Sequence, residues 1–328
     1  MEHYIHYFET EQEFDAKYNG NDYHEPLVSV TNSNSSINYN KGEYETLLTT
    51  PLTFEILSSG TIYWVTKSTT KTIEYKKNNG EWTSITSNIG SSAPSITVVS
   101  GDTIQFRGNN TTYATSTSNY NWFKCSTTQF KVKGNIMSLI DSTNFSILTT
   151  LSSDYTFFSL FTFCTGLTDT SKLILPATTL TNMCYHSMFY NCTSLTTAPK
   201  LLATTLGGGC YNSMFYNCTS LTTAPELPAS ILANSCYLDM FKKCTSLTTA
   251  PELPAITLKN YCYNGMFSDC TSLNYIKCLA TDISATDCIK DWVEYISPTG
   301  IFVKNPSMTN WPTGLSGIPS GWTVQDAV

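Results

Sequence analysis

The chain has little charge. Of its 328 residues, 18 are Lys or Arg and 25 are Asp or Glu, so charged residues make up 13%, about half the share usual in soluble domains. It has no basic stripe of the kind that a phosphate backbone requires, so we expect no nucleic-acid partner. It also has no run of 18 apolar residues and does not begin with the basic, apolar and small-residue order of a secretory signal. We therefore expect neither membrane insertion nor export.

Signatures of enzymes and metal sites are equally scarce. The histidines are His3, His6, His24 and His186, and no C-x-x-C motif occurs. The run Gly207-Gly-Gly209 lacks the Lys-Ser/Thr of a phosphate-binding loop, which favours loop flexibility or close approach to a neighbouring segment. We accordingly expect no catalytic, cofactor-binding or metal-binding residues, and no cofactor.

What the chain does have is apolar and aromatic surface. It is 41% hydrophobic and contains 16 Phe and 20 Tyr, so wholesale disorder is excluded. Residues 1–50 carry nine acids against Lys17 and Lys41, and they alternate acids with aromatics. Two interpretations stay open: an anchoring arm that becomes ordered on another protein, or a strand or short helix that packs on the chain's own next domain. The candidate anchoring residues are Tyr4, Tyr7, Phe8, Phe14, Tyr18 and Tyr23.

Residues 51–133 alternate apolar and polar side chains in short β-rich runs. We predict strands at 52–56, 61–65, 72–75, 95–99, 103–106 and 129–132, separated by Gly- and Asn-containing turns. The segment 75–82 contains Asn-Gly and predicts a hairpin. This pattern favours a small antiparallel β-sandwich of the immunoglobulin-like type.

The second half of the chain repeats itself every 26 residues. Five columns of identical residues occur, namely Cys184/Cys210/Cys236/Cys262, Met188/Met214/Met240/Met266, Phe189/Phe215/Phe241/Phe267, Cys192/Cys218/Cys244/Cys270 and Leu195/Leu221/Leu247/Leu273. A partial unit, displaced by 28 residues, precedes them, and another follows at Cys288. We place the array at residues 134–300, with partial units that depart from the repeat pattern at both ends as caps.

Within each unit, Cys-Tyr-x-x-Met-Phe-x-x-Cys places apolar residues in a stripe that predicts a short helix. Pro199, Pro225 and Pro251 then require an extended stretch. The expected fold class is therefore multidomain: an N-terminal arm, an all-β sandwich and an α/β leucine-rich-repeat solenoid. Residues 301–328 are expected to form its C-terminal cap, and Trp292, Trp311 and Trp322 are expected to seal the open end.

The twelve cysteines allow three interpretations. Eight helical residues between Cys184 and Cys192 would rise about 12 Å, too far for a disulfide, and metal binding would need closer spacing. Thiols that fill the interior as small hydrophobes are therefore favoured.

The motif Met-Phe-x-x-Cys-Thr-Ser-Leu-Thr-Thr-Ala-Pro-x-Leu-Pro-Ala resembles the BspA-type leucine-rich repeats of surface proteins of gut Bacteroides and of their phages. The first segment, 14–29, is similar to leaders of virion proteins of Bacteroides phages, including the crAss-like group, and the β-rich part resembles their immunoglobulin-like modules. The sequence departs from the pattern at Leu202, where other units have Pro, and at Gly207. The resemblance implies adhesion.

The variable positions of each unit are expected to face outward, where Tyr and Asn suit recognition. The candidate ligand-binding residues are Tyr190, Asn191, Tyr216, Asn217, Lys242, Lys243 and Asp269. The alternative is an ordinary solvated surface. Paired carboxylates could in principle cleave glycans. Glu226, Asp239 and Glu252, however, lie at variable, solvated repeat positions, which disfavours that role.

These features together predict a non-enzymatic phage virion protein, assembled in the host cytoplasm. Its arm would bind other virion proteins of capsid or tail, and its repeats would bind a host-surface protein or glycan, or mucus. Virion fibres are usually symmetric, so a homo-oligomer is expected. One alternative is a Bacteroides cell-surface adhesin, located at the cell surface. A second is a fibre-borne glycan depolymerase.

Overall fold

The computed structural model describes residues 41–328. These residues form one α-helix, thirteen strands, three short 3-10 helices and long runs of turns. The elements are α2 (Lys41–Thr49), β1 (Leu52–Ile56), β2 (Gly60–Thr66), β3 (Thr72–Lys77), β4 (Thr83–Thr86), η1 (Gly90–Ser92), β5 (Ser95–Val98), β6 (Thr103–Arg107), β7 (Ala114–Ser116), β8 (Asn119–Lys124), β9 (Phe130–Asn135), η2 (Ile136–Leu139), η3 (Phe145–Ile147), β10 (Leu167–Ile174), β11 (Tyr275–Cys278), β12 (Ile301–Lys304) and β13 (Thr323–Asp326).

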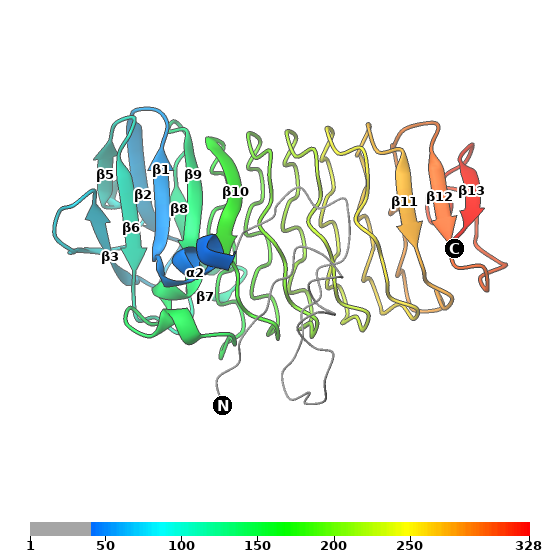
Figure 1. Ribbon diagram of the computed structural model, residues 1–328, viewed down its shortest axis with the longest axis horizontal. Helices are drawn as coiled ribbons and strands as arrows, with labels where there is room; N and C mark the ends of the chain where they lie inside the picture. The colour runs from blue at the N-terminus through cyan, green and yellow to red at the C-terminus, as the bar shows by residue number, and fades with distance from the viewer. Residues whose placement is uncertain (1–40) are drawn as a thin grey trace.

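The first half contains two sheets. One has the order β10-β9-β1-β6-β3-β4, and the other has the order β5-β2-β8-β7 (Figure 1). Aromatic side chains fill the space between them, since Phe54 of β1 and Phe106 of β6 lie 5.0 and 4.7 Å from the ring of Phe123 on β8. All six strands predicted from alternation are present, and so is the hairpin, which joins β3 to β4. The positive φ of its turn lies at Asn78.

The β-rich part continues directly into the repeats. Strand β9 pairs in parallel with β10, which belongs to the partial unit that precedes the first full repeat. The ring of Phe161, in the same unit, lies 5.9 Å from Phe54 and 5.8 Å from Phe123. One hydrophobic cluster therefore extends from the two sheets through the whole array.

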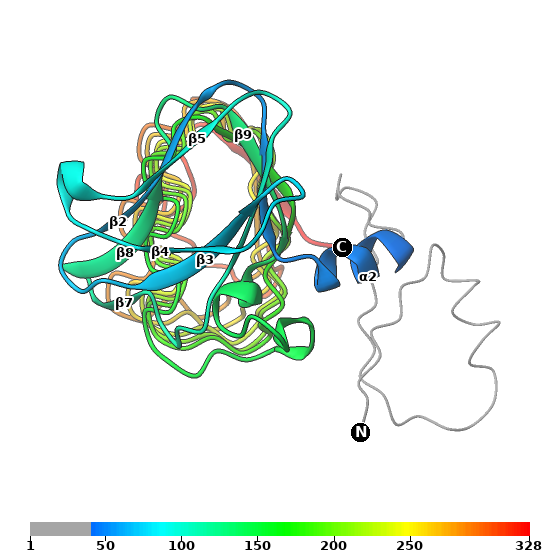
Figure 2. The ribbon, with the colours of Figure 1, turned by 90° about the vertical axis from the view of Figure 1, so that its left-hand side faces the viewer.

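The repeats form a row of stacked coils, one coil per 26 residues, which Figure 1 shows from the side and Figure 2 shows end-on. Parallel β-bridges join equivalent residues of adjacent coils, for example Thr179 to Thr205 and Thr205 to Ile231. The prediction of an α/β leucine-rich-repeat solenoid is wrong. Helix α2 is the one α-helix of residues 41–328 and lies outside the repeats, so the described chain is β-rich without a helical layer.

A ladder of turns occupies the position of each predicted helix. In the coil that contains Ser187, alternate amides donate to the next coil, such as Ser187 N to Asn212 O at 2.8 Å. The amides between them donate to the residue three earlier in the same coil, such as Tyr190 N to Ser187 O at 3.1 Å. Every fourth residue has positive φ, 53° at Ser187 and 59° at Asn191. An α-helix of L-residues excludes that conformation, so no helix can form.

This geometry keeps two neighbouring residues inside and the next two outside. The inward pairs build ladders of rings, in which Phe189 and Phe215 are 5.5 Å apart with an interplanar angle of 8°. A second ladder runs through Tyr185 and Tyr211 at 5.9 Å and 13°. Such pairs contribute about 0.5–1.5 kcal/mol each beyond the area they bury.

The twelve cysteines belong to the hydrophobic cluster that extends through the two sheets and the repeats. All twelve cysteines are unbridged and buried, which confirms that their side chains fill the core. Burial raises the pKa of the Cys184 thiol to about 12. Cysteine thus acts here as a small apolar residue with a weak S–H donor.

The far end of the stack is closed by the three parallel strands β11, β12 and β13 and by tryptophans. Trp292 is fully buried and stacks on Trp311 at 6.0 Å and 9°. Trp322 is also buried, and its Nε1 donates to Ser297 O at 2.8 Å. These contacts confirm that Trp311 and Trp322 pack on the end of the array.

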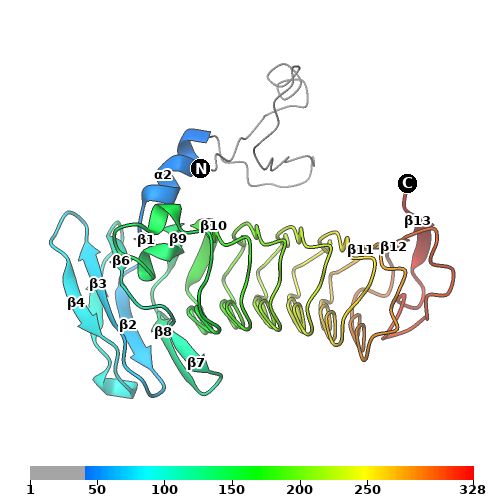
Figure 3. The same ribbon diagram turned by 90° about the horizontal axis from the view of Figure 1, so that it is seen from below.

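Helix α2 lies against the side of the sheet at β9 and β10 (Figure 3). Tyr44 and Leu47 are buried with Ile174 in a small cluster separate from the main core. For residues 41–50, therefore, the short helix packed on the chain's own sheet is the correct alternative. Nine residues are too few for a helix that is stable alone, so α2 depends on this contact. The candidate anchoring residues Tyr4, Tyr7, Phe8, Phe14, Tyr18 and Tyr23 lie outside the described residues.

Candidate functional site

One outward face of the turn ladders carries a row of large aromatic and charged side chains. Tyr190 and Tyr216 occupy equivalent positions in adjacent coils, and their rings stack at 4.6 Å and 11°. Phe163 meets Tyr190 edge-on at 5.6 Å, and Lys243 Nζ lies 5.7 Å from the centre of the Tyr216 ring. We call these four residues the tyrosine–lysine row. The two tyrosines are half-buried, whereas Phe163 and Lys243 are exposed.

Two asparagines form a second line beside the row. Asn217 Nδ2 donates to Asn191 Oδ1 at 2.6 Å across adjacent coils. Both residues have positive φ, 59° at Asn191 and 58° at Asn217, a conformation that Asn tolerates better than most residues. The turn ladder therefore places these amides, and the bond between them limits their motion.

The remaining predicted residues continue the same two lines. Lys242 follows Tyr216 one coil on, and its Nζ lies 3.5 Å from Asp239 Oδ1. Asp239 packs over the backbone of Gly265, where a Cβ would lie 2.2 Å from its Oδ1. Burial raises the pKa of the Asp239 carboxyl, and the Lys242 ammonium opposes that shift. Asp269 follows Lys243 one coil on, at a φ of 63°.

The seven predicted ligand-binding residues thus lie on one face, on turn ladders instead of helices. The sequence could not show that Tyr190 and Tyr216 cover each other's faces, because that depends on the distance between coils. The sequence signal that was missed lies at every fourth residue of these segments, which in most cases is Ser, Asn, Asp or Gly. Such residues favour a positive φ over a helix.

Two other residues considered in the sequence analysis pack against the preceding coil. His186 stacks on Phe158 at 4.8 Å and 6°, and burial lowers its pKa to about 4. Gly207 lies against the backbone of Thr181, where a Cβ would be 2.4 Å from Thr181 C. The alternative of close approach to a neighbour is therefore correct for this glycine.

Two of the three carboxylates considered for glycan cleavage have lysine partners. Glu252 pairs with Lys277 at 2.9 Å, and Asp239 pairs with Lys242. Glu226 is exposed. Within residues 41–328 no three His, Cys, Asp or Glu side chains are grouped as metal ligands, and no helix there is long and apolar enough to cross a membrane.

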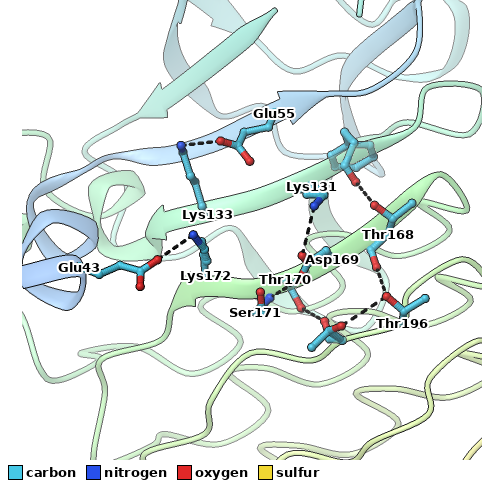
Figure 4. Close-up of polar contacts among 12 residues, drawn as sticks. Glu43, Glu55, Lys131, Lys133, Thr168, Asp169, Thr170, Ser171, Lys172 and Thr196 are labelled. Carbon is cyan, nitrogen blue, oxygen red and sulfur yellow. Dashed lines mark hydrogen bonds and ion pairs between the residues drawn. The ribbon is translucent and has the colours of Figure 1, made fainter. Parts of the chain in front are cut away.

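A second polar surface, which sequence reasoning missed, covers the outer side of β1, β9 and β10 (Figure 4). Three ion pairs cross it: Lys131 to Asp169 at 3.7 Å, Lys133 to Glu55, and Lys172 to Glu43 at 2.7 Å. The last pair links β10 to α2, and the hydrogen bond that Lys172 donates to the Glu43 carboxylate raises the pKa of Lys172.

Beside α2 these side chains border a pocket of about 430 Å³, lined by Gly42, Glu43, Thr46, Leu47, Lys133 and Lys172. Because each of its lysines already has a carboxylate partner, we assign this surface to the docking of α2. The parallel pairing of β9 with β10 brings Lys133 and Lys172 together, and no local pattern in the sequence indicates that pairing.

In comparisons with known proteins, no family model, no curated protein and no solved structure matches the chain.

Proposed function

We propose that this chain is a non-enzymatic adhesion protein of a phage virion, in which the stacked coils present the tyrosine–lysine row to a ligand on the host surface or in mucus. The virion setting comes from the resemblance of the repeats and of the leader. The observation that carries the binding role is the row itself, a set of amphipathic side chains held in fixed positions on one face.

Preorganisation is what makes the row suitable for binding. The ring of Tyr190 is held between Phe163 and Tyr216, and the ring of Tyr216 is held between Tyr190 and Lys243. Ordering such side chains at an interface costs about 0.5–1.5 kcal/mol each, and here the fold has already done so. Tyrosine also offers a large contact surface at a low entropic cost.

The proposal assigns attachment to the N-terminal residues 1–50, with other virion proteins as partners and a homo-oligomer as the assembled form. Of that segment, α2 is fixed to β10 through Tyr44 and Leu47. Deleting residues 1–40 while keeping α2 should therefore leave a folded protein that no longer enters particles. Mass spectrometry of purified virions measures this, and undiminished incorporation of the deleted chain would refute the anchoring role. Finding the protein in bacterial surface fractions and not in virions would favour the cell-surface adhesin.

Binding itself is tested with the labelled full chain on a panel of Bacteroides strains and on mucin. We expect Tyr216→Ala to reduce binding at least tenfold, because it removes one ring and exposes the other. Thr222→Ala, at an exposed position outside the row, is the control and should bind like the parent chain. Equal binding by Tyr216→Ala and the parent would exclude the row as the binding site.

A further inference from the structure

The two tyrosine rings of the row stack on each other, so the faces between them are closed to a sugar. Tyr216 covers one face of the Tyr190 ring at 4.6 Å. The Tyr190 ring also makes an edge contact with Phe163. Tyr216 has Tyr190 on one face and the Lys243 ammonium over its ring. What these residues can offer to a ligand is their edges, which carry the hydroxyl groups.

The row ends in a cation without a carboxylate partner. Among residues 41–328, no carboxylate oxygen lies within 4.0 Å of Lys243 Nζ, whereas neighbouring Lys242 is paired with Asp239. The hydrogen bond with Tyr216 raises the pKa of Lys243, so the ammonium stays charged. Asp269 is the nearby acid on the next coil, and it lies beyond ion-pair distance. The Tyr216 hydroxyl accepts from the Lys243 ammonium and keeps its own proton to donate, and the ammonium has further protons to donate.

Strand addition by a peptide is not possible on this face. The backbone amides of Tyr190 and Tyr216 donate within their own coils, to Ser187 O and Ser213 O at 3.1 Å. The amides of Asn191, Asn217 and Lys243 donate to the next coil, each at 2.8 Å. Extended peptides gain affinity from free main-chain groups at a sheet edge, and none of these amides is free.

From these contacts we infer that the ligand of the row is an acidic glycan, whose carboxylate or sulfate oxygens accept hydrogen bonds from Lys243 and from the hydroxyls of Tyr190 and Tyr216. Oxyanions form the strongest hydrogen bonds with such charged and phenolic donors. The amides of Asn191 and Asn217 lie beside the row, where they can contact the sugar hydroxyls. This inference rests on the proposed binding role and names the ligand class for it.

The test uses immobilised polysaccharides in matched pairs: a uronic-acid polymer and its carboxyl-reduced form, and a sulfated polymer and its desulfated form. The full chain should bind at least one acidic member about tenfold or more tightly than its neutral partner. The affinity should fall as salt rises, since exposed charges are screened. The uronate and sulfate arms distinguish the two sources of the anion.

Three variants assign the effect to the row. Lys243→Gln should lose about tenfold in affinity for the acidic polymer and most of its salt dependence, whereas Lys243→Arg should keep both. Tyr216→Phe keeps the stacked ring and removes only the hydroxyl, so it should weaken binding several-fold. Lys259→Gln removes an exposed charge from another part of the stack and is the charge-matched control.

The outcomes separate this inference from the proposed function. Equal binding to acidic and neutral glycans, or binding to a host protein alone, would overturn the acidic ligand and leave the adhesive role in place. Acidic binding that Lys243→Gln and Lys259→Gln reduce equally would show a nonspecific charge effect and also overturn it. Failure to bind any strain, mucin or glycan would refute both.

Discussion

The thiol of Cys218 donates a hydrogen bond to the carbonyl oxygen of Phe189 in the preceding coil, at 3.2 Å. The same contact recurs along the column, from Cys192 to Phe161 O, from Cys244 to Phe215 O and from Cys270 to Phe241 O. Each sulfur thus fills the interior and also links one coil to the coil before it. Burial raises the pKa of Cys218 well above its ordinary range.

The burial of the cysteines predicts their reactivity. The thiolate is the reactive form, so thiols that are both buried and hard to ionise should react slowly. We expect no rapid labelling by a thiol reagent in the folded protein at pH 8, and labelling of all twelve cysteines after unfolding. Mass spectrometry counts the labels. Rapid labelling of several cysteines in the folded chain would show that the interior is open.

The ladder of buried tyrosines predicts a contrast between two Tyr→Phe variants. The hydroxyl of Tyr237 has no hydrogen-bond partner within the described residues, whereas that of Tyr113 donates to Leu139 O at 2.7 Å. Tyr237→Phe should keep or raise the free energy of unfolding, because it removes an unpaired buried polar group. Tyr113→Phe should lower it by about 1 kcal/mol. Denaturant unfolding measures both, and the reverse order would contradict these contacts.

His186 predicts a loss of stability in mild acid. Burial lowers its pKa to about 4, below the ordinary value of 6.5, so between these pH values the unfolded chain binds a proton that the folded chain does not. The free energy of unfolding should therefore fall by about 2–3 kcal/mol as the pH drops from about 6.5 to 4.

The matched variant for this pH effect is His186→Asn, because the next coil has Asn212 at the equivalent position. Its unfolding free energy should change less over the same pH range. Parallel pH profiles for the two proteins would mean that His186 does not titrate as its surroundings imply.

Ser213 distinguishes the turn ladder from a helix. Its φ is 53°, and Gly265 has a φ of 60° two coils on, at the equivalent position. Ser213→Gly should therefore be neutral or stabilising, and Ser213→Val should cost about 1–2 kcal/mol. A helix would reverse the sign for glycine, which destabilises helix interiors. Thermal or denaturant unfolding of the two variants decides between them.

The sequence predicted the period, the inward columns and the β-rich first half because each depends on which residues are apolar. It failed on the helix because two inward residues followed by two outward ones, as in Met188, Phe189, Tyr190 and Asn191, repeat every four residues. A helical stripe repeats every 3.6, and over one short segment the two patterns coincide. Strand β7 has three residues, and the two buried side chains of β8 are Asn121 and Phe123, so neither strand showed a clear alternation of apolar and polar residues.

The sequence predicted which residues of the candidate site face outward. It did not predict which of their side chains contact one another. That Tyr190 and Tyr216 would stack, and that Lys243 would lie over Tyr216, depends on the distance between coils. The docking of α2 depends on the parallel pairing of β9 and β10, which joins segments whose contact no local pattern reveals.

The central structural claim is that the repeats are stacked turn ladders, on which the row and its ligand depend. The most direct test is the backbone conformation of Ser213 and Asn217, measured by NMR in the full chain. The account predicts positive φ at both, with amides of alternate residues bonded to the next coil. Negative φ throughout residues 210–218, with each amide bonded four residues back in its own coil, would contradict it.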